Sequence, residues 1–246
     1  MSNVLAICGK GGVGKTTLAA LMARVLVGGG RGRVLVVDAD PAGGLAMALG
    51  LAGRRTLDDL RRELIARVKD GTSPDPTDLV AMADYRLMET LVEREKLAFL
   101  GVGRPEEEGC YCKLNVFLRG SIEALSGQFA LTIIDAEAGI EQINRRVMRT
   151  VSHLLLVSDV SQKGLRVAET ILEVAGAVEA GLVINRAKRD EGERAASRTG
   201  LRLLGVIPED PLVREFDMEA RSFFEVPEDC AALRASDTIF QAFGIT

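Results

Sequence analysis

The sequence has little that would mark it for a membrane, a nucleic acid or secretion. No apolar run approaches the roughly 20 residues that a membrane-spanning helix needs. Lysine and arginine (31) are outnumbered by aspartate and glutamate (35), and the resulting net charge of −4 disfavours a nucleic-acid-binding surface. The opening stretch "MSNVLAICGK" lacks the basic region and the long apolar core of a signal peptide. We therefore expect a cytoplasmic protein that binds neither nucleic acid nor membrane.

Cysteine and histidine are also scarce, with four and one in the chain. In a reducing compartment, clustered cysteines bind metals or carry redox chemistry more often than they form structural disulfides. Cys110 and Cys112 stand one residue apart, whereas Cys8 and Cys230 are isolated and are predicted to pack in the core. His153 opens an apolar run, so we predict a structural role for it.

The pattern of apolar residues predicts one α/β domain over residues 1–246, because 246 residues with 47% apolar content suffice for one sizeable core. Short apolar runs without polar alternation predict strands buried on both faces, at 3–8, 33–38, 96–101, 131–135, 153–159, 181–185 and 202–207. Apolar residues at helical spacing predict helices around 18–26, 57–68, 114–125 and 165–175, with Thr56 as a candidate N-cap. Strands that alternate with helices predict a mainly parallel twisted sheet with helices on both faces. Residues 70–78 are expected to form a loop, and the charged stretch 186–200 a solvated surface.

A glycine-rich stretch, "GKGGVGKT" at 9–16, follows the first predicted strand and opens a predicted helix. This context favours a phosphate-binding loop over an ordinary glycine turn, because glycines let successive N–H groups point at phosphate oxygens at a helix N-terminus. Lys15 is predicted to reach the β- and γ-phosphates, and the Thr16 hydroxyl to bind Mg²⁺. The predicted nucleotide-binding residues of this loop are Gly9, Lys10, Gly11, Gly12, Val13, Gly14, Lys15, Thr16 and Thr17.

The additional lysine, Lys10, makes "KGGVGKTT" similar to the deviant Walker A motif of the MinD/ParA/nitrogenase-iron-protein class of P-loop ATPases. In that class the early lysine crosses a dimer interface and touches the partner's phosphates. The resemblance therefore implies an ATP-hydrolysing homodimer, with Lys10 and Lys15 both acting on phosphate. Because Lys10 would come from the other copy, ATP should favour the closed dimer.

Acidic residues at two strand ends extend this resemblance. In "VVDADP", Asp40 is implied to position the attacking water, with Asp38 as the alternative. In "LTIIDAEAG", Asp135 is implied to hold the Mg²⁺ shell, and Gly139 to sense the γ-phosphate. The simpler alternative is that these acids only cap the elements that follow them.

Two further stretches resemble the adenine- and ribose-side contacts of the class. They are "VINR", with Asn185 and Arg186, and "IPED", with Pro208 and Asp210. Amide and carboxylate groups suit the donor and acceptor edge of a purine. ATP or ADP with Mg²⁺ is thus the expected cofactor set.

The stretch "EEEGCYCKLN", in a predicted loop near 105–115, is the strongest metal-binding signal. With one residue between them, Cys110 and Cys112 project to the same side of an extended chain and can both reach one ion at about 2.3 Å. Two thiolates leave a four-coordinate site half complete, and a second copy related by a two-fold axis would supply the other two. A disulfide between these cysteines would close a strained ring, and simple packing suits the Glu-rich flank poorly. The glutamates themselves either form a solvated acidic loop or attract cations.

The cysteine pair, together with "DAEAGIEQINR" from Asp135 onward, resembles the CooC-type nickel-insertion ATPases that mature carbon monoxide dehydrogenase. The resemblance implies that Cys110 and Cys112 bind nickel between two subunits, and that hydrolysis drives its delivery to carbon monoxide dehydrogenase or acetyl-CoA synthase. Glu137 lies in the similar stretch without an assigned role. Thiolates suit Ni²⁺ and Zn²⁺ alike, so both ions remain open.

Two other functions of the class stay as alternatives. One is a MinD/ParA-like spatial-positioning ATPase, which needs a basic helix or face, yet no lysine or arginine follows Arg234. The other is an iron–sulfur-bridged electron-donor ATPase, against which the absence of cysteine in "IEQINRRVM" counts.

Overall fold

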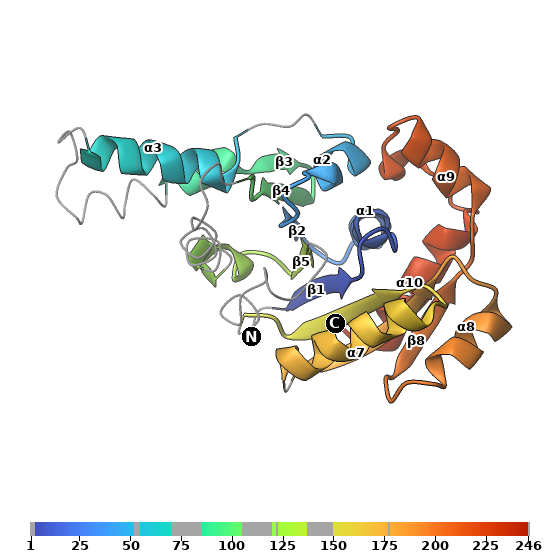
Figure 1. Ribbon diagram of the computed structural model, residues 1–246. Helices are drawn as coiled ribbons and strands as arrows, with labels where there is room; N and C mark the ends of the chain where they lie inside the picture. Colours follow the sequence, from blue (N-terminus) through green and yellow to red (C-terminus); the bar gives the residue numbers. More distant parts are fainter. Residues whose placement is uncertain are drawn as a thin grey trace.

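A mostly parallel β-sheet forms the centre of the protein, for which a computed structural model describes residues 3–51, 55–69, 85–104, 120–121, 123–136, 150–176 and 178–245 (Figure 1). The strands are β1 (Val4–Gly9), β2 (Val34–Asp38), β3 (Val92–Arg94), β4 (Leu97–Gly101), β5 (Leu131–Asp135), β6 (His153–Ser158), β7 (Glu179–Asn185) and β8 (Leu203–Ile207). Within the described residues they lie in the order β3-β4-β2-β5-β1-β6-β7-β8, and β3 alone runs antiparallel to its neighbour. The predicted α/β fold is confirmed.

Helices cover both faces of the sheet, as predicted. They are α1 (Lys15–Gly28), α2 (Gly44–Ala48), α3 (Leu57–Lys69), α7 (Gln162–Ala175), α8 (Arg189–Ala196), α9 (Pro211–Met218), the 3₁₀ turn η1 (Phe223–Glu225) and α10 (Ala231–Phe243). Residues 85–90, 120–121 and 123–126 are also helical. None of the helices in the described part of the chain has the length and apolar character needed to cross a membrane.

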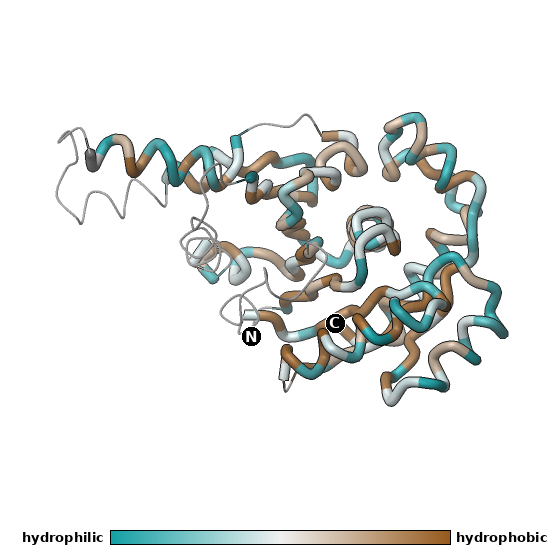
Figure 2. The backbone as a smooth tube through the Cα atoms, viewed as in Figure 1, coloured by the Kyte–Doolittle hydropathy of each residue, from teal (hydrophilic) through white to brown (hydrophobic). Residues whose placement is uncertain are grey.

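The parallel strands contribute to two hydrophobic cores, because successive side chains point to opposite faces of the sheet. Leu5 and Ile7 join the core shared with α1, α2, α9, η1 and α10, whereas Val4 and Ala6 join the core shared with α3, α7 and α8. Figure 2 shows the consequence, with hydrophobic colour concentrated along the strands and polar colour on the outer sides of the helices. The uninterrupted apolar runs of the sequence thus arise from burial on both faces.

The antiparallel strand β3 is absent from the sequence prediction. It has three residues, and its burial is only partial, so the stretch "VER" carries neither a continuous nor an alternating apolar pattern. A tight turn with Glu95 at φ 50° returns the chain into β4. This strand is recognised by its antiparallel hydrogen bonding to β4, which the local sequence does not show.

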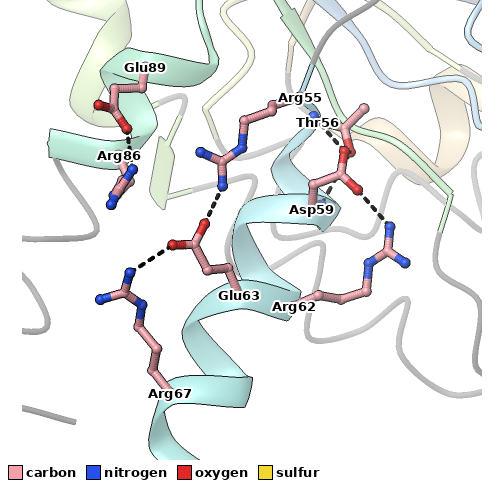
Figure 3. A network of polar contacts seen from close by, with 8 residues as sticks. All are labelled: Arg55, Thr56, Asp59, Arg62, Glu63, Arg67, Arg86 and Glu89. Carbon is pink, nitrogen blue, oxygen red and sulfur yellow. Dashed lines mark hydrogen bonds and ion pairs between the residues drawn. The ribbon is translucent and has the colours of Figure 1, made fainter. Parts of the chain in front are cut away.

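Helix α3 begins as predicted, with Thr56 as its cap. Asp59 N–H donates to Thr56 Oγ1 at 3.2 Å, and Thr56 N–H donates to Asp59 Oδ2 at 2.9 Å, which is a reciprocal capping box. Further along, Glu63 pairs with both Arg55 and Arg67 (Figure 3). These ion pairs are exposed, so each stabilises the helix by only about 0–1 kcal/mol.

The carboxyl ends of the parallel strands meet at one edge of the sheet, where ligands of open α/β folds bind. Strand β1 leads there into the glycine-rich loop, β2 ends at Asp38, β5 at Asp135 and β7 at Asn185. Strand β8 leads into Pro208 two positions before the cap of α9. Sequence positions that are far apart are therefore brought to one edge of the sheet.

Candidate active site

The glycine-rich loop ends at Gly14, the N-cap of α1, which adopts a left-handed conformation with φ 90° and ψ 29°. Gly14 has no side chain to cap the first turn of α1, and that turn contains no acidic residue. The first N–H groups of this helix are therefore free of the usual side-chain acceptor, and the positive end of the helix dipole favours an anion. Loop and helix together fit a phosphate group.

Lysines at both ends of the loop are held only weakly in the single chain. Lys15 is buried, and its Nζ donates to the Lys10 carbonyl at a long 3.4 Å. Lys10 Nζ lies 3.9 Å from Asp159 Oδ2, directly after β6. Burial alone would raise the pKa of Asp159, but hydrogen bonds from Ser161 and the charge of Lys10 lower it, so the carboxylate stays charged.

Sequence reasoning missed Asp159. A signal was present, because Asp159 directly follows a buried strand, as Asp38 and Asp135 end theirs. Its contact with Lys10 depends on the pairing of β1 with β6, which no local pattern shows.

The buried carboxylates Asp38 and Asp135 are register partners on adjacent strands, yet they are bonded very differently. Asp38 accepts hydrogen bonds from the N–H groups of Leu45 (2.9 Å) and Asp40 (3.2 Å). Both oxygens of Asp135 are buried without a hydrogen-bond partner among the described residues. The pair therefore combines a satisfied carboxylate that shapes the loop with an unsatisfied one.

The electrostatics of these carboxylates reflect their burial. Burial raises the pKa of Asp38 to about 6, against the opposing backbone N–H groups. It raises the pKa of Asp135 to about 7, while the Asp38 charge adds to the rise. Lys15 opposes the rise, as does the Thr16 hydroxyl, which is close but completes no hydrogen bond with Asp135. A positive ion beside Asp135 would relieve this cost.

Asp40 sits in the loop between β2 and α2 and is only partly buried. Its Oδ1 accepts from Ala42 N–H at 2.9 Å, and its carbonyl accepts from Gly43 N–H at 2.9 Å. The start of α2 lies against Thr16, because a Cβ placed on Gly44 would be 3.7 Å from the Thr16 methyl group. Asp40 is therefore held in a turn beside the phosphate-binding loop.

A cavity of about 310 Å³ opens next to the loop, between α1 and α9. Its lining includes Gly14, Thr17, Asn185, Arg186, Pro208 and Asp210. The four residues predicted to contact the base and ribose are thus brought together beside the phosphate-binding loop. The size and position suit a nucleoside attached to phosphates in the loop.

Asp210 is committed to helix capping. Its Oδ1 accepts from Leu212 N–H of α9 at 3.0 Å, and its Oδ2 accepts from Ala232 N–H of α10 at 3.2 Å. The Cys230 thiol also donates to Oδ2 at 3.3 Å. Burial would raise the pKa of Asp210, but these donors lower it. One carboxylate therefore ties two helices together at the rim of the cavity.

The isolated cysteines and the histidine lie where structural roles are expected. Cys8 and Cys230 are buried, and burial raises the pKa of the Cys8 thiol to about 12, which leaves it unreactive. His153 opens β6 at the opposite edge of the sheet, with its ring edge-to-face against Phe243 at 5.3 Å. The hydrogen bond from the Cys230 thiol to Asp210 was not predicted from the sequence.

The residues present fit a Mg²⁺–nucleotide complex. Mg²⁺ takes hard oxygen ligands, retains several waters and binds nucleotides through one or two carboxylates. Asp135 offers carboxylate oxygens that have no hydrogen-bond partner in the described ranges, and the Thr16 hydroxyl lies beside it. Within the described ranges, no cluster of three or more His, Cys, Asp or Glu forms a separate metal site. These features define a P-loop ATPase.

Comparison with known proteins identifies the family. The model of the CobQ/CobB/MinD/ParA nucleotide-binding domain matches residues 4–223, and the chain belongs to this family. An uncharacterized ATP-binding protein of Methanocaldococcus jannaschii is 33% identical, and the carbon monoxide dehydrogenase accessory protein CooC of Rhodospirillum rubrum is 27% identical. Each match covers 92% of this chain, together with 92% of the Methanocaldococcus protein and 91% of CooC.

Solved structures of MinD share the fold. The cell division ATPase MinD of Pyrococcus furiosus gives a TM-score of 0.74 at 24% identity, covering 99% of each chain. MinD of Pyrococcus horikoshii, complexed with Mg-ADP, gives 0.70 at 24% identity, covering 97% of this chain and 94% of that one. The family match confirms the MinD/ParA-like class inferred from the sequence, and these structures show that the fold is shared.

Several predicted residues lie outside the described residues. They are Cys110 and Cys112 of the metal-binding loop, Glu137, Gly139, the loop at 70–78 and most of the helix around 114–125. Nickel or zinc binding therefore stays a prediction. The charged stretch 186–200 is described, and it forms α8, which exposes its charged side chains and packs Ala195 and Ala196 on the sheet.

Proposed function

We propose that the protein is an ATP-driven metallochaperone, a homodimer that holds nickel between its subunits and delivers it to carbon monoxide dehydrogenase or acetyl-CoA synthase. The observation that carries this proposal is the position from which the cysteine-bearing segment leaves the sheet. Strand β4 ends at Gly101, the register partner of Asp38, so the segment begins at the nucleotide edge. Metal cargo and nucleotide would thus be coupled through one edge of one sheet.

Sequence and relatives both support this cargo. The chain carries Cys110 and Cys112 one residue apart, and it is similar over most of its length to a carbon monoxide dehydrogenase accessory protein. Two thiolates from each of two copies complete a four-sulfur site. Nickel is here the cargo and Mg²⁺–ATP the cofactor; zinc is the competing cargo.

The residues of the single chain suggest how nucleotide controls the dimer. Lys10 would leave Asp159 and reach the phosphates of the second copy, while Lys15 stays with its own. Because the ion pair of Lys10 is long and partly exposed, little free energy opposes this move. ATP and metal then favour the same closed dimer, so each raises the affinity for the other.

For hydrolysis, the bonding pattern favours Asp40 over Asp38 as the water-positioning carboxylate. Asp38 uses both oxygens to bind backbone N–H groups, whereas Asp40 engages Ala42 N–H through Oδ1. Mg²⁺ held near Asp135 and Thr16 would supply charge stabilisation at the phosphates. Loss of the γ-phosphate would weaken the Lys10 contact and open the four-sulfur site.

A spatial-positioning ATPase of the MinD or ParA kind is the second candidate, because solved MinD structures share the fold. Such a role requires a free basic or amphipathic surface. The apolar face of α10 is already used, with Phe240 and Phe243 buried in the core beside α1. Tight ATP-dependent binding to liposomes or DNA would favour this candidate.

Elemental analysis of anaerobically purified protein, with and without ATP, tests the proposal. We expect about one nickel per ATP-bound dimer and none in a Cys110→Ser, Cys112→Ser double variant, which should still bind ATP. Tyr111→Phe, between the two cysteines, is the matched control and should keep its nickel. Full nickel retention in the double variant would refute the role of the cysteines. A brown iron–sulfur chromophore would instead indicate the electron-donor alternative.

A further inference from the structure

The residues at the end of β7 contact backbone carbonyls of the phosphate-binding loop. Asn185 Nδ2 donates to the Val13 carbonyl at 2.7 Å, and Arg186 Nη1 donates to the Gly12 carbonyl at 3.2 Å. The loop and these two residues are separated by more than 170 positions in the sequence. Two consecutive carbonyls of the loop are thus held from one strand end.

These contacts fix the direction of the N–H groups that face phosphate. A trans peptide is planar, so its C=O and the N–H of the next residue point in opposite directions. Holding the Gly12 carbonyl outward turns the Val13 N–H inward, and holding the Val13 carbonyl outward turns the Gly14 N–H inward. Preorganised N–H groups bind an anion without a reorganisation cost.

Asn185 is itself immobilised. Its side chain is buried, and its Oδ1 accepts from Arg186 N–H at 3.0 Å. It also lies so close to the loop that a Cβ on Gly14 would sit 2.4 Å from Asn185 Nδ2. The amide plane is therefore locked by two hydrogen bonds and by direct contact with the loop.

Arg186 adopts an unfavourable backbone conformation. Its φ is 56°, in the left-handed region that non-glycine residues rarely occupy. Such conformations cost free energy and persist where the surrounding structure imposes them, often at functional sites. Here the conformation accompanies a guanidinium that reaches the Gly12 carbonyl.

We infer that Asn185 and Arg186 are positioning residues for the phosphate-binding loop, and that they strengthen binding of any Mg²⁺–polyphosphate, with or without a base. The inference rests on the nucleotide site and is independent of nickel delivery. It differs from the sequence-based expectation, in which both residues read the adenine and ribose. Because both also line the cavity, they link the nucleoside position to the loop.

Calorimetry with Mg-ATP and with Mg-tripolyphosphate separates the two roles. Asn185→Asp keeps the shape but places an oxygen against the Val13 carbonyl, and Arg186→Asn removes the guanidinium while tolerating the left-handed backbone. We expect both variants to weaken both ligands in parallel, by about 10- to 100-fold for Asn185→Asp and less for Arg186→Asn. Arg186→Lys, which keeps one donor, should recover part of the loss. Arg189→Gln, on the exposed start of α8, is the surface control.

Loss of ATP affinity with unchanged tripolyphosphate affinity would overturn the inference in favour of base recognition, and unchanged affinity for both ligands would overturn it outright. Amide hydrogen exchange across residues 9–16 of the ligand-free protein gives a second readout. Exchange should accelerate in Asn185→Asp and Arg186→Asn, and unaltered exchange would also contradict the inference. If the wild-type chain bound neither ligand, the proposed nucleotide site would be refuted. The exchange experiment would still test whether Asn185 and Arg186 position the loop.

Discussion

The phosphate half and the nucleoside half of the site are built in opposite ways. In the phosphate half, as far as the structure describes it, Asp135 is buried without a hydrogen-bond partner and Lys15 is held by one long hydrogen bond. In the nucleoside half, Asn185, Arg186 and Asp210 already have partners within the protein. The two halves adjoin at Gly14, which lines the cavity and caps α1.

This difference indicates where ligand binding supplies free energy to the protein. Buried polar groups without partners are costly, so the phosphate half gains most when a phosphate and a cation arrive. The nucleoside half is stable before binding and changes little. Substitution of Lys15 should therefore act mainly on affinity and substitution of Asp210 mainly on folding. Asn185 and Arg186, by contrast, act on affinity through the loop that they contact.

Lys15→Ala should give the largest effect. The substitution removes the buried cation predicted to contact the β- and γ-phosphates, and we expect Mg-ATP affinity to fall by at least about 100-fold, measured by calorimetry. The thermal unfolding midpoint should change little, because within the described part of the chain the lysine makes one hydrogen bond, and that bond is long. Lys163→Ala, on the exposed face of α7, is the charge-matched control. Near-normal ATP affinity in Lys15→Ala would contradict the proposed difference between the phosphate half and the nucleoside half.

Asp135→Asn should stabilise the ligand-free protein at pH 8, by of the order of 2–4 kcal/mol, because it removes a buried charge whose pKa is raised to about 7. A raised native pKa means that the contribution of Asp135 to stability is present below about pH 4 and is lost as pH rises through 7. The gain should therefore shrink toward pH 4 in urea titrations. Asp38→Asn is the comparison variant and should gain less, because the pKa of Asp38 is raised only to about 6 and the new amide removes an acceptor from one of two backbone N–H groups. With Mg-ATP present, Asp135→Asn should bind more weakly.

Asp210→Ala should destabilise the protein by about 1–2 kcal/mol, since it removes the caps of α9 and α10 together. Differential scanning calorimetry would register this as a lower unfolding temperature. Asp217→Ala, an exposed residue of α9 that lines the same cavity, is the control. If Asp210→Ala folded normally but lost ATP, Asp210 would belong to the ligand-binding groups instead.

Asp159→Asn should have the smallest effect. It removes the charge that holds Lys10 in its own chain but keeps an oxygen for Ser161, and a partly exposed ion pair is worth about 0–1 kcal/mol. We expect ATP-dependent dimerisation to strengthen by up to about fivefold in sedimentation experiments. In a Lys10→Ala background, Asp159→Asn should leave ATP-dependent dimerisation unchanged. An equal increase in that background would show that the effect does not act through the Lys10–Asp159 contact.

The sequence predicted the elements that depend on local patterns. Seven buried strands, the cap at Thr56 and the loop from Gly9 to Thr16 follow from apolar runs, capping residues and glycine spacing. These features recur wherever the same residues occur in the same order. The fold class followed from their alternation.

The bonding within the site was not predictable, because it depends on which strand ends meet. The capping of two helices by Asp210, the pairing of Lys10 with Asp159 and the contact of Asn185 with Val13 all join distant segments. The left-handed backbone of Arg186 also has no sequence signal. Cys110 and Cys112 carry the most specific functional prediction, and their arrangement lies outside the described residues.

Sedimentation of the wild-type chain with Mg-ATP and Ni²⁺, followed by metal analysis of each species, tests most directly whether nucleotide and cargo share one closed dimer. We predict that nickel sediments with an ATP-dependent dimer at about one ion per two chains, and that Lys15→Ala abolishes both the dimer and the stoichiometric nickel. Nickel bound to single chains at the same level with and without ATP would contradict the coupling.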